Sequence, residues 1–308
     1  MRKAVCHIIL VASICIAAAC SANTAAHIAT ETRVDATPEP GYQSPPIPAA
    51  VIDTARTATG FRVMTYNIAH GRGQSFHQVL LTRQTIRSNL ARIGQLIADQ
   101  RPQVIAFQEL DGPSVWSGNF DHASTLAGFV GYPVFFRGHH GKGMGRVELD
   151  YGTGIITQFH IADRRSQVFD TSWRDNKGYV KTVLKTGIGG AEEVDVVSVH
   201  LDFLSPKTRK RQLDILARAL EQRTRPLVVM GDFNCAWDSD DCVRSFAQRL
   251  GLQTHGGEIG TPTFPSDRPT KQLDWILISS DLAFNNYETL PQGYSDHLAV
   301  VADVVVVE

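Results

Sequence analysis

Short apolar runs that border polar residues constrain the fold of this chain more than any other feature. Runs of this length and composition are typical of strands buried inside a layered protein. The runs are Phe61–Tyr66, Val104–Phe107, Val194–Val199, Leu227–Met230, Trp275–Ile278 and Leu298–Val307. Polar side chains at the ends of such strands are costly to bury without partners, so we expect them to converge on one site.

Amphipathic helices are expected between these strands. Thr85–Gln100 carries an apolar stripe at helical spacing and ends before Pro102, and Lys207–Gln222 has a similar stripe. The alternation of strands and helices predicts one α/β domain over residues 59–308, a size near the upper end for a single domain.

The N-terminus has the layout of a bacterial export signal over residues 1–20. Two basic residues precede the apolar run Ile8–Ala19, which is too short to be a stable membrane anchor. Cys20 then indicates a lipoprotein signal, in which this cysteine carries the lipid, and cleavage after Ala19 without lipidation is the alternative. Residues 21–58 are rich in Ala, Thr and Pro and predict an extended tether.

These features predict an exported protein. An outer-membrane or periplasmic lipoprotein is the favoured location, and a periplasmic or secreted protein is the alternative. The N-terminal lipid would bring the domain to a membrane surface.

Outside the signal stand only Cys235 and Cys242. In an exported chain this pair predicts a disulfide, with two free thiols as the alternative.

Net charge argues mildly against a dedicated nucleic-acid-binding protein. Removing the signal leaves 30 − 2 = 28 basic and 31 acidic side chains, a net charge of −3. Proteins that bind duplex DNA tightly usually present a basic face, so nucleic acid is an open but disfavoured partner. One basic cluster, Lys207–Arg211, could bind phosphate, but a solvated helix face is the favoured interpretation.

The polar strand ends predict a cation beside an acid/base group. Glu109 and Asn67 offer oxygen ligands of the kind that Mg²⁺ prefers. Asp296 and His297 are adjacent, so on an extended backbone one could contact the cation while the other faces a scissile phosphate. This combination is the chemistry of phosphoester hydrolysis.

Further acid/base partners follow from spacing. Asp274 could orient and polarise the imidazole of His297, and His200 could be a second acid/base group. Asp232 and Asn234 are two residues apart and would project to one side of an extended backbone, with an Asx turn as the alternative. Gly231 would permit close backbone approach at this point.

Six ordered motifs then resemble the endonuclease/exonuclease/phosphatase superfamily over Phe61–Val307. They are Met64-Thr-Tyr-Asn-Ile, Phe107-Gln-Glu-Leu, Ser198-Val-His-Leu, Gly231-Asp-Phe-Asn, Leu273-Asp-Trp-Ile and Ser295-Asp-His. Thr65-Tyr-Asn-Ile-Ala-His-Gly-Arg-Gly and Thr263-Phe-Pro-Ser-Asp-Arg-Pro most resemble its bacterial metal-dependent hydrolase branch. The resemblance implies a four-layer α/β sandwich of two mixed sheets covered by helices.

The resemblance also implies roles for individual residues and a bound Mg²⁺, with Mn²⁺ able to replace it. The implied metal ligands are Asn67, Glu109 and Asp296, and the implied acid/base pair is His297 with Asp274. The resemblance further implies that Asp232 and Asn234 position the nucleophile and the phosphate. His200 matches the second histidine of the deoxyribonuclease-like members. Tyr151 and Thr153 align with a substrate-contacting segment. Thr153 stands where many members have asparagine, and its shorter reach could shift substrate preference.

The expected activity is hydrolysis of a phosphodiester by in-line attack of water, performed by a monomer. A secreted nuclease and a membrane phospholipid or sphingolipid phosphodiesterase are alternatives within the same chemistry. A surface binding protein that has lost turnover is the alternative of another class, disfavoured because the expected acid/base and metal positions are filled.

Overall fold

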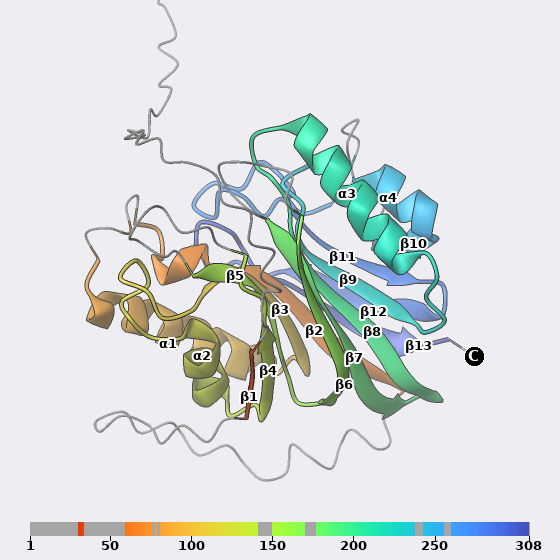
Figure 1. Cartoon of the computed structure of the whole chain (residues 1–308), viewed down its shortest axis with the longest axis horizontal. Coiled ribbons are helices and arrows are strands. Elements are labelled where there is room, and N and C mark those ends of the chain that lie inside the picture. Colours follow the sequence, from red (N-terminus) through yellow and green to blue (C-terminus); the bar gives the residue numbers. More distant parts are fainter. Residues whose placement is uncertain are drawn as a thin grey trace, which may run out of the picture.

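The structure is a computed structural model that describes residues 30–33, 59–75, 78, 81–140, 150–169, 177–237, 243–255 and 260–307. Within these residues two sheets lie face to face, and helices cover their outer faces (Figure 1). This is the four-layer α/β sandwich that the resemblance implied, and the prediction is confirmed.

The first sheet contains seven described strands, and β2 pairs in parallel with β3 while the other neighbours are antiparallel. Its order is β1 (Thr30–Arg33), β4 (Val134–Arg137), β5 (Tyr151–Thr157), β3 (Val104–Asp111), β2 (Gly60–Asn67), β13 (Val300–Val306) and β12 (Leu282–Thr289).

The second sheet contains six described strands, and only β8 and β9 pair in parallel. Its order is β10 (Leu252–Gln253), β11 (Asp274–Ser279), β9 (Leu227–Asp232), β8 (Ala191–His200), β7 (Gly178–Ile188) and β6 (His160–Val168).

Helices α1 (Arg83–Gln100) and α2 (His122–Val130) cover the first sheet, and α3 (Pro206–Leu220) and α4 (Val243–Leu250) cover the second. A short 3-10 turn, η3 (Ala69–Gly71), follows β2. Thr82 and Ser205 cap α1 and α3 by accepting hydrogen bonds from backbone N–H groups of the first turn. In the described part of the chain, no helix has the length and apolar character needed to cross a membrane.

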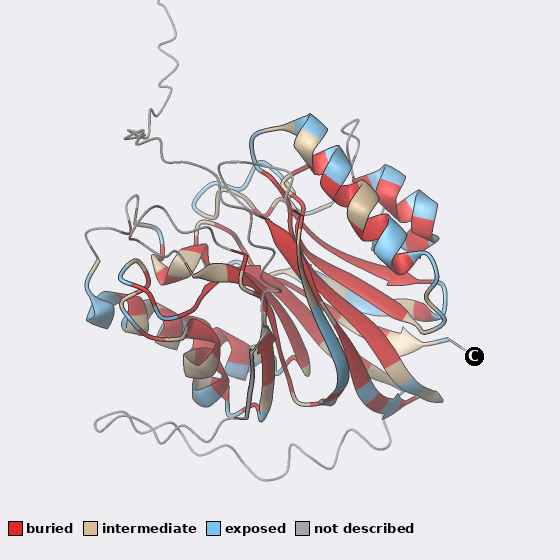
Figure 2. Cartoon of the chain, viewed as in Figure 1, coloured by how far each residue is buried: buried red, intermediate tan, exposed pale blue. Residues whose placement is uncertain are grey.

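Three hydrophobic clusters fill the spaces between the four layers, and Figure 2 shows buried residues along most strands of both sheets. Strand alternation sorts the side chains. In β9, Val228 and Met230 face the inter-sheet cluster, whereas Leu227 and Val229 face α3 and α4. Strands buried on both faces explain why the runs are continuously apolar in sequence.

All six strands and both helices expected from the apolar patterns are present, with boundaries that differ by at most four residues. The export signal, Cys20 and most of the 21–58 segment lie outside the described residues. Within that segment, Thr30–Arg33 pairs with β4 at the edge of the first sheet.

Gly231 leaves no room for a side chain, as its sequence context predicted. A Cβ atom on Gly231 would lie 2.0 Å from the carbonyl oxygen of Val199 on β8. Gly231→Ala should therefore destabilise the fold by about 1–3 kcal/mol, because the strands must separate. Urea denaturation measures the effect. Gly128→Ala is the matched control, since its Cβ would meet nothing within 4 Å and a helical alanine is favourable.

Candidate active site

Strand register places two rows of polar residues opposite each other at one edge of the inter-sheet core. Within each row, neighbours are directly paired, so their side chains share a face of the sheet. The row on the first sheet is Asn67, Gln108 and Thr153, and the row on the second sheet is His200, Asp232 and Asp274. Both rows continue lines of apolar residues from the inter-sheet cluster, so the site begins where the core ends.

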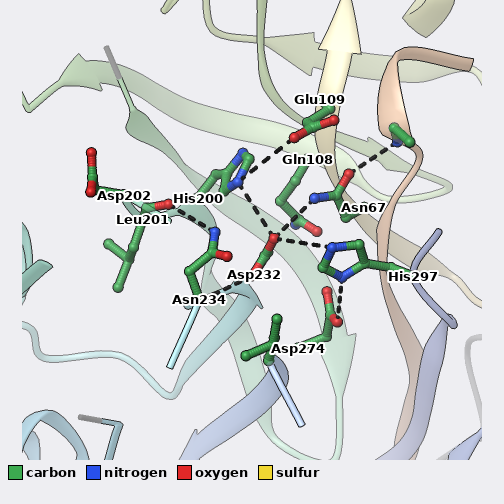
Figure 3. A network of polar contacts seen from close by, with 12 residues as sticks. Asn67, Gln108, Glu109, His200, Leu201, Asp202, Asp232, Asn234, Asp274 and His297 are labelled. Carbon is green, nitrogen blue, oxygen red and sulfur yellow. Dashed lines mark hydrogen bonds and ion pairs between the residues drawn. The ribbon is translucent and has the colours of Figure 1, made fainter. Parts of the chain in front are cut away.

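Asp232 is the centre of the polar network (Figure 3). Its Oδ2 accepts a hydrogen bond from Asn67 Nδ2 at 2.9 Å across the two sheets. The same oxygen lies 3.4 Å from His200 Nε2 and 3.7 Å from His297 Nε2. Three side chains, from the ends of β2 and β8 and from the segment before β13, thus meet around one buried carboxylate.

His297 and Asp274 form the acid/base pair expected from sequence. Nδ1 of His297 lies 2.8 Å from Oδ2 of Asp274, and both residues are buried. Burial alone would lower the pKa of His297, but the negative charges of Asp274 and Asp232 outweigh burial and raise that pKa to about 10. In the absence of a cation, the imidazole therefore carries a proton at neutral pH.

Asp274→Asn tests this balance directly. Removing the Asp274 charge takes away the strongest influence that raises the pKa of His297, so the pKa should fall below about 10. Measuring the ring-proton chemical shifts of His297 by NMR against pH, in EDTA, gives the value. An unchanged titration would show that Asp274 does not hold this proton. Asp281→Asn, at an exposed position, is the control.

A divalent cation suits this site, because burial raises the pKa of Asp232 to about 7 against the opposing effects of His297 and Asn67. A cation would favour the ionised carboxylate. Two ligand sets compete. Donor atoms of Asp232, Asp274 and His297 lie within 4.8 Å of one another, whereas the sequence indicated Asn67 and Glu109. In the first set His297 would bind through Nε2, since its Nδ1 is bonded to Asp274. We favour the second set because Mg²⁺ prefers oxygen ligands.

A β-bulge turns Glu109 toward the site. In a regular strand Glu109 would share the outer face with Ile105 and Phe107. Instead its φ is +54°, and the pairing of β3 with β5 shifts register between Gln108 and Leu110. Oε1 of Glu109 consequently lies 4.0 Å from Nε2 of His200 on the opposite sheet.

His70, which the sequence analysis did not single out, holds the other side of Glu109. Its Nε2 lies 3.1 Å from Oε2 of Glu109, and its Nδ1 lies 2.8 Å from Asp111 Oδ1. Burial would lower the pKa of His70, but Asp111 and Glu109 raise it to about 9. The sequence did contain one indication of a cationic partner at this place. Glu109 and Asp111 are two carboxylates at the end of the same strand.

Asn234 and Asp296 have surroundings that the sequence did not favour or indicate. The backbone at Asn234 is not extended, since its φ is +51°. Its N–H donates to Asp232 Oδ1 at 2.9 Å, which is the Asx turn considered as the alternative, and its Nδ2 donates to Leu201 O at 3.0 Å. Asp296 forms an ion pair with Arg72, and its carboxylate has no direct contact with Asp232 among the described residues. Its expected role as a metal ligand stays a prediction.

The two expected substrate contacts lie on β5. Thr153 is fully buried, and its Oγ1 has no hydrogen-bond partner among the described residues, so its expected contact with substrate stays a prediction. The ring of Tyr151 lies 5.7 Å from that of His70 in an edge-to-face arrangement.

The disulfide between Cys235 and Cys242 remains a prediction. Cys235 is buried, and Cys242 lies outside the described residues.

The chain belongs to the Endonuclease/Exonuclease/phosphatase family, whose model matches residues 64–297. Members of this family are hydrolases that act on phosphoester bonds and typically depend on a divalent metal. No curated protein matches the chain.

Solved structures of low sequence identity share the fold. An endonuclease/exonuclease/phosphatase from Beutenbergia cavernae is 18% identical with a TM-score of 0.64, covering 80% of this chain and 72% of that one. The mannosyl-6-phosphatase of Bacteroides thetaiotaomicron is 14% identical with a TM-score of 0.62, covering 80% and 99%. The human Nocturnin catalytic domain, with bound sulfate, is 21% identical with a TM-score of 0.62, covering 82% and 96%.

Proposed function

We propose that this protein is an exported, metal-dependent phosphodiesterase. The observation that carries the proposal is the pair His297–Asp274 beside Asp232, opposite Asn67 and Glu109 at one edge of the inter-sheet core. An acid/base pair beside a carboxylate and amide cluster is the arrangement that hydrolysis of a phosphoester by water requires.

The proposed cofactor is Mg²⁺, with Mn²⁺ as a substitute, held by Glu109 and Asn67. The ion would supply positive charge that neutralises Asp232 and stabilises charge on the phosphate. With Asp232 neutralised, the pKa of His297 would fall, because Asp232 is one of the charges that raise it. His297 could then take a proton from water while Asp274 holds the imidazole in place.

His200 has a separate role as a hydrogen-bond donor. Burial lowers the pKa of His200 well below its ordinary value, and the charges of Lys177 and His297 add to this effect. A neutral imidazole at pH 7 carries one N–H that can donate to a phosphate oxygen, and it has no second proton to give.

The decisive experiment compares substrates with the chain from residue 21 onward, which keeps every residue that the structure describes. Bis(p-nitrophenyl) phosphate, p-nitrophenyl phosphate and plasmid DNA are each incubated with Mg²⁺, Mn²⁺ or EDTA. Cleavage of the diester that EDTA abolishes supports the proposal. Preference for the monoester would assign a phosphatase, and cleavage of DNA would assign a nuclease. Binding without turnover of any phosphoester would favour a surface binding protein.

Export and lipidation of Cys20 complete the proposal. Mass spectrometry of the protein isolated from cell membranes should show a lipidated N-terminal Cys20. A soluble product that begins after the signal would show simple release instead. Sedimentation velocity should show a monomer.

A further inference from the structure

The loop between β8 and α3 exposes two large apolar side chains. Phe203 is 58% exposed and Leu204 is 60% exposed. Among the described residues, only Val115 and Val307 are large hydrophobic residues with comparable exposure. Neighbouring exposed Phe and Leu side chains are unfavourable in water, so a surface that keeps both exposed indicates a contact outside the folded domain.

A fixed turn presents these side chains. Oδ1 of Asp202 accepts hydrogen bonds from the backbone N–H groups of Leu204 at 2.9 Å and Ser205 at 2.7 Å. Ser205 caps α3 through the N–H of Thr208, and Arg209 Nη1 donates to the carbonyl of Asp202 at 3.0 Å. Because the backbone is held at both ends of the turn, Phe203 and Leu204 lose little conformational entropy on binding.

Three basic side chains follow the turn on helix α3. Lys207, Lys210 and Arg211 are exposed on the first turns of α3, and none of them forms an ion pair within the described part of the chain. Further along α3, Asp214 pairs with Arg249. The start of α3 therefore presents three exposed positive charges that pair with no carboxylate among the described residues, although the chain without its signal is slightly acidic.

This surface adjoins the catalytic edge. Phe203 follows His200 by three residues, and the intervening Leu201 accepts a hydrogen bond from Asn234 of the site (Figures 1 and 3). The amine of Lys177 lies 6.0 Å from the ring centroid of Phe203, and its charge contributes to the lowered pKa of His200. Any partner bound by this surface is thus brought beside the site.

We propose that Phe203, Leu204, Lys207, Lys210 and Arg211 form a docking surface for an anionic phospholipid bilayer. Exposed apolar side chains beside Lys and Arg suit the headgroup region, where the apolar groups insert and the cations attract anionic lipid. A nucleic acid would also attract the cations, but it offers no apolar layer for an aliphatic side chain such as Leu204. Docking requires no turnover, so it stands apart from the proposed phosphodiesterase activity.

Vesicle sedimentation tests the docking surface with the unlipidated chain from residue 21 onward. Phosphatidylcholine vesicles with and without phosphatidylglycerol are compared. We expect binding to the anionic vesicles to weaken at least about tenfold in Phe203→Ser/Leu204→Ser and in Lys210→Ala/Arg211→Ala. The matched controls are Val307→Ser, at an exposed apolar residue that directly follows β13, and Lys185→Ala/Arg218→Ala, which removes the same charge at other exposed positions.

Several outcomes would overturn the proposal. These are absence of vesicle binding by the unaltered chain, equal losses in the control variants, or binding of single-stranded DNA, but not vesicles, through the same residues. Dimerisation that disappears in Phe203→Ser/Leu204→Ser would assign the surface to a second copy of the chain. Hydrolysis of bis(p-nitrophenyl) phosphate in solution should be unchanged in both docking variants, which separates failure of docking from failure of the proposed activity.

Discussion

Replacing His297 with alanine should reduce phosphodiester hydrolysis by about 10³-fold, the contribution of a positioned acid/base group. His297 is held 2.8 Å from Asp274 and 3.7 Å from Asp232, and no other described imidazole is paired with Asp274. The measurement is kcat/KM for bis(p-nitrophenyl) phosphate with Mn²⁺. A loss in kcat at constant KM would place the role of His297 in the chemical step.

Two controls make this result specific. His255→Ala removes an exposed histidine that stacks on Tyr287, and it should leave the rate unchanged. The thermal midpoint of His297→Ala, measured in the same buffer, shows whether the fold survives. A folded variant with full activity would refute the acid/base role of His297.

Replacing Glu109 with glutamine should weaken Mn²⁺ binding by at least roughly 10²-fold. Loss of a residue that only hydrogen-bonds to a metal ligand costs up to about this factor in affinity, and Glu109 is proposed as a direct ligand. The amide keeps the shape of the side chain and removes only its charge. Isothermal titration calorimetry measures the affinity without any need for activity. Glu192→Gln, at an exposed position on β8, is the matched control.

The same titration distinguishes the two ligand sets. If Glu109→Gln binds Mn²⁺ normally while Asp232→Asn does not, the cation is held by Asp232, Asp274 and His297, whose donor atoms already lie within 4.8 Å of one another. If both variants bind poorly, Asp232 contributes to the site centred on Glu109.

The link between docking and catalysis would have a functional consequence. Lys177 lies 6.0 Å from the ring centroid of Phe203 and acts electrostatically on His200, so a bilayer held at Phe203 would lie beside His200. An enzyme that hydrolyses a lipid headgroup would gain access to its substrate in this way. A lipid anchor at Cys20 would raise the local concentration of the domain at the membrane.

Local pattern predicted the strands and helices well, because burial on both faces makes long stretches of β3, β9 and β11 continuously apolar in sequence. Gly231 was expected to permit close backbone approach, and it lies against Val199 of β8. At Asn234 an αL backbone and the Asx turn considered as the alternative replace the extended conformation, because short polar side chains compete locally with strand geometry.

The sequence by itself determined which residues are polar at strand ends, and so that Asn67, Glu109, Asp232, Asp274 and His297 are the residues that needed partners. Only the tertiary structure decided how they meet. Register between distant strands set the two facing rows, a bulge turned Glu109 away from the outer face, and Arg72 engaged Asp296. These outcomes depend on contacts between segments far apart in the chain. The local periodicity of the sequence does not indicate which strands become neighbours.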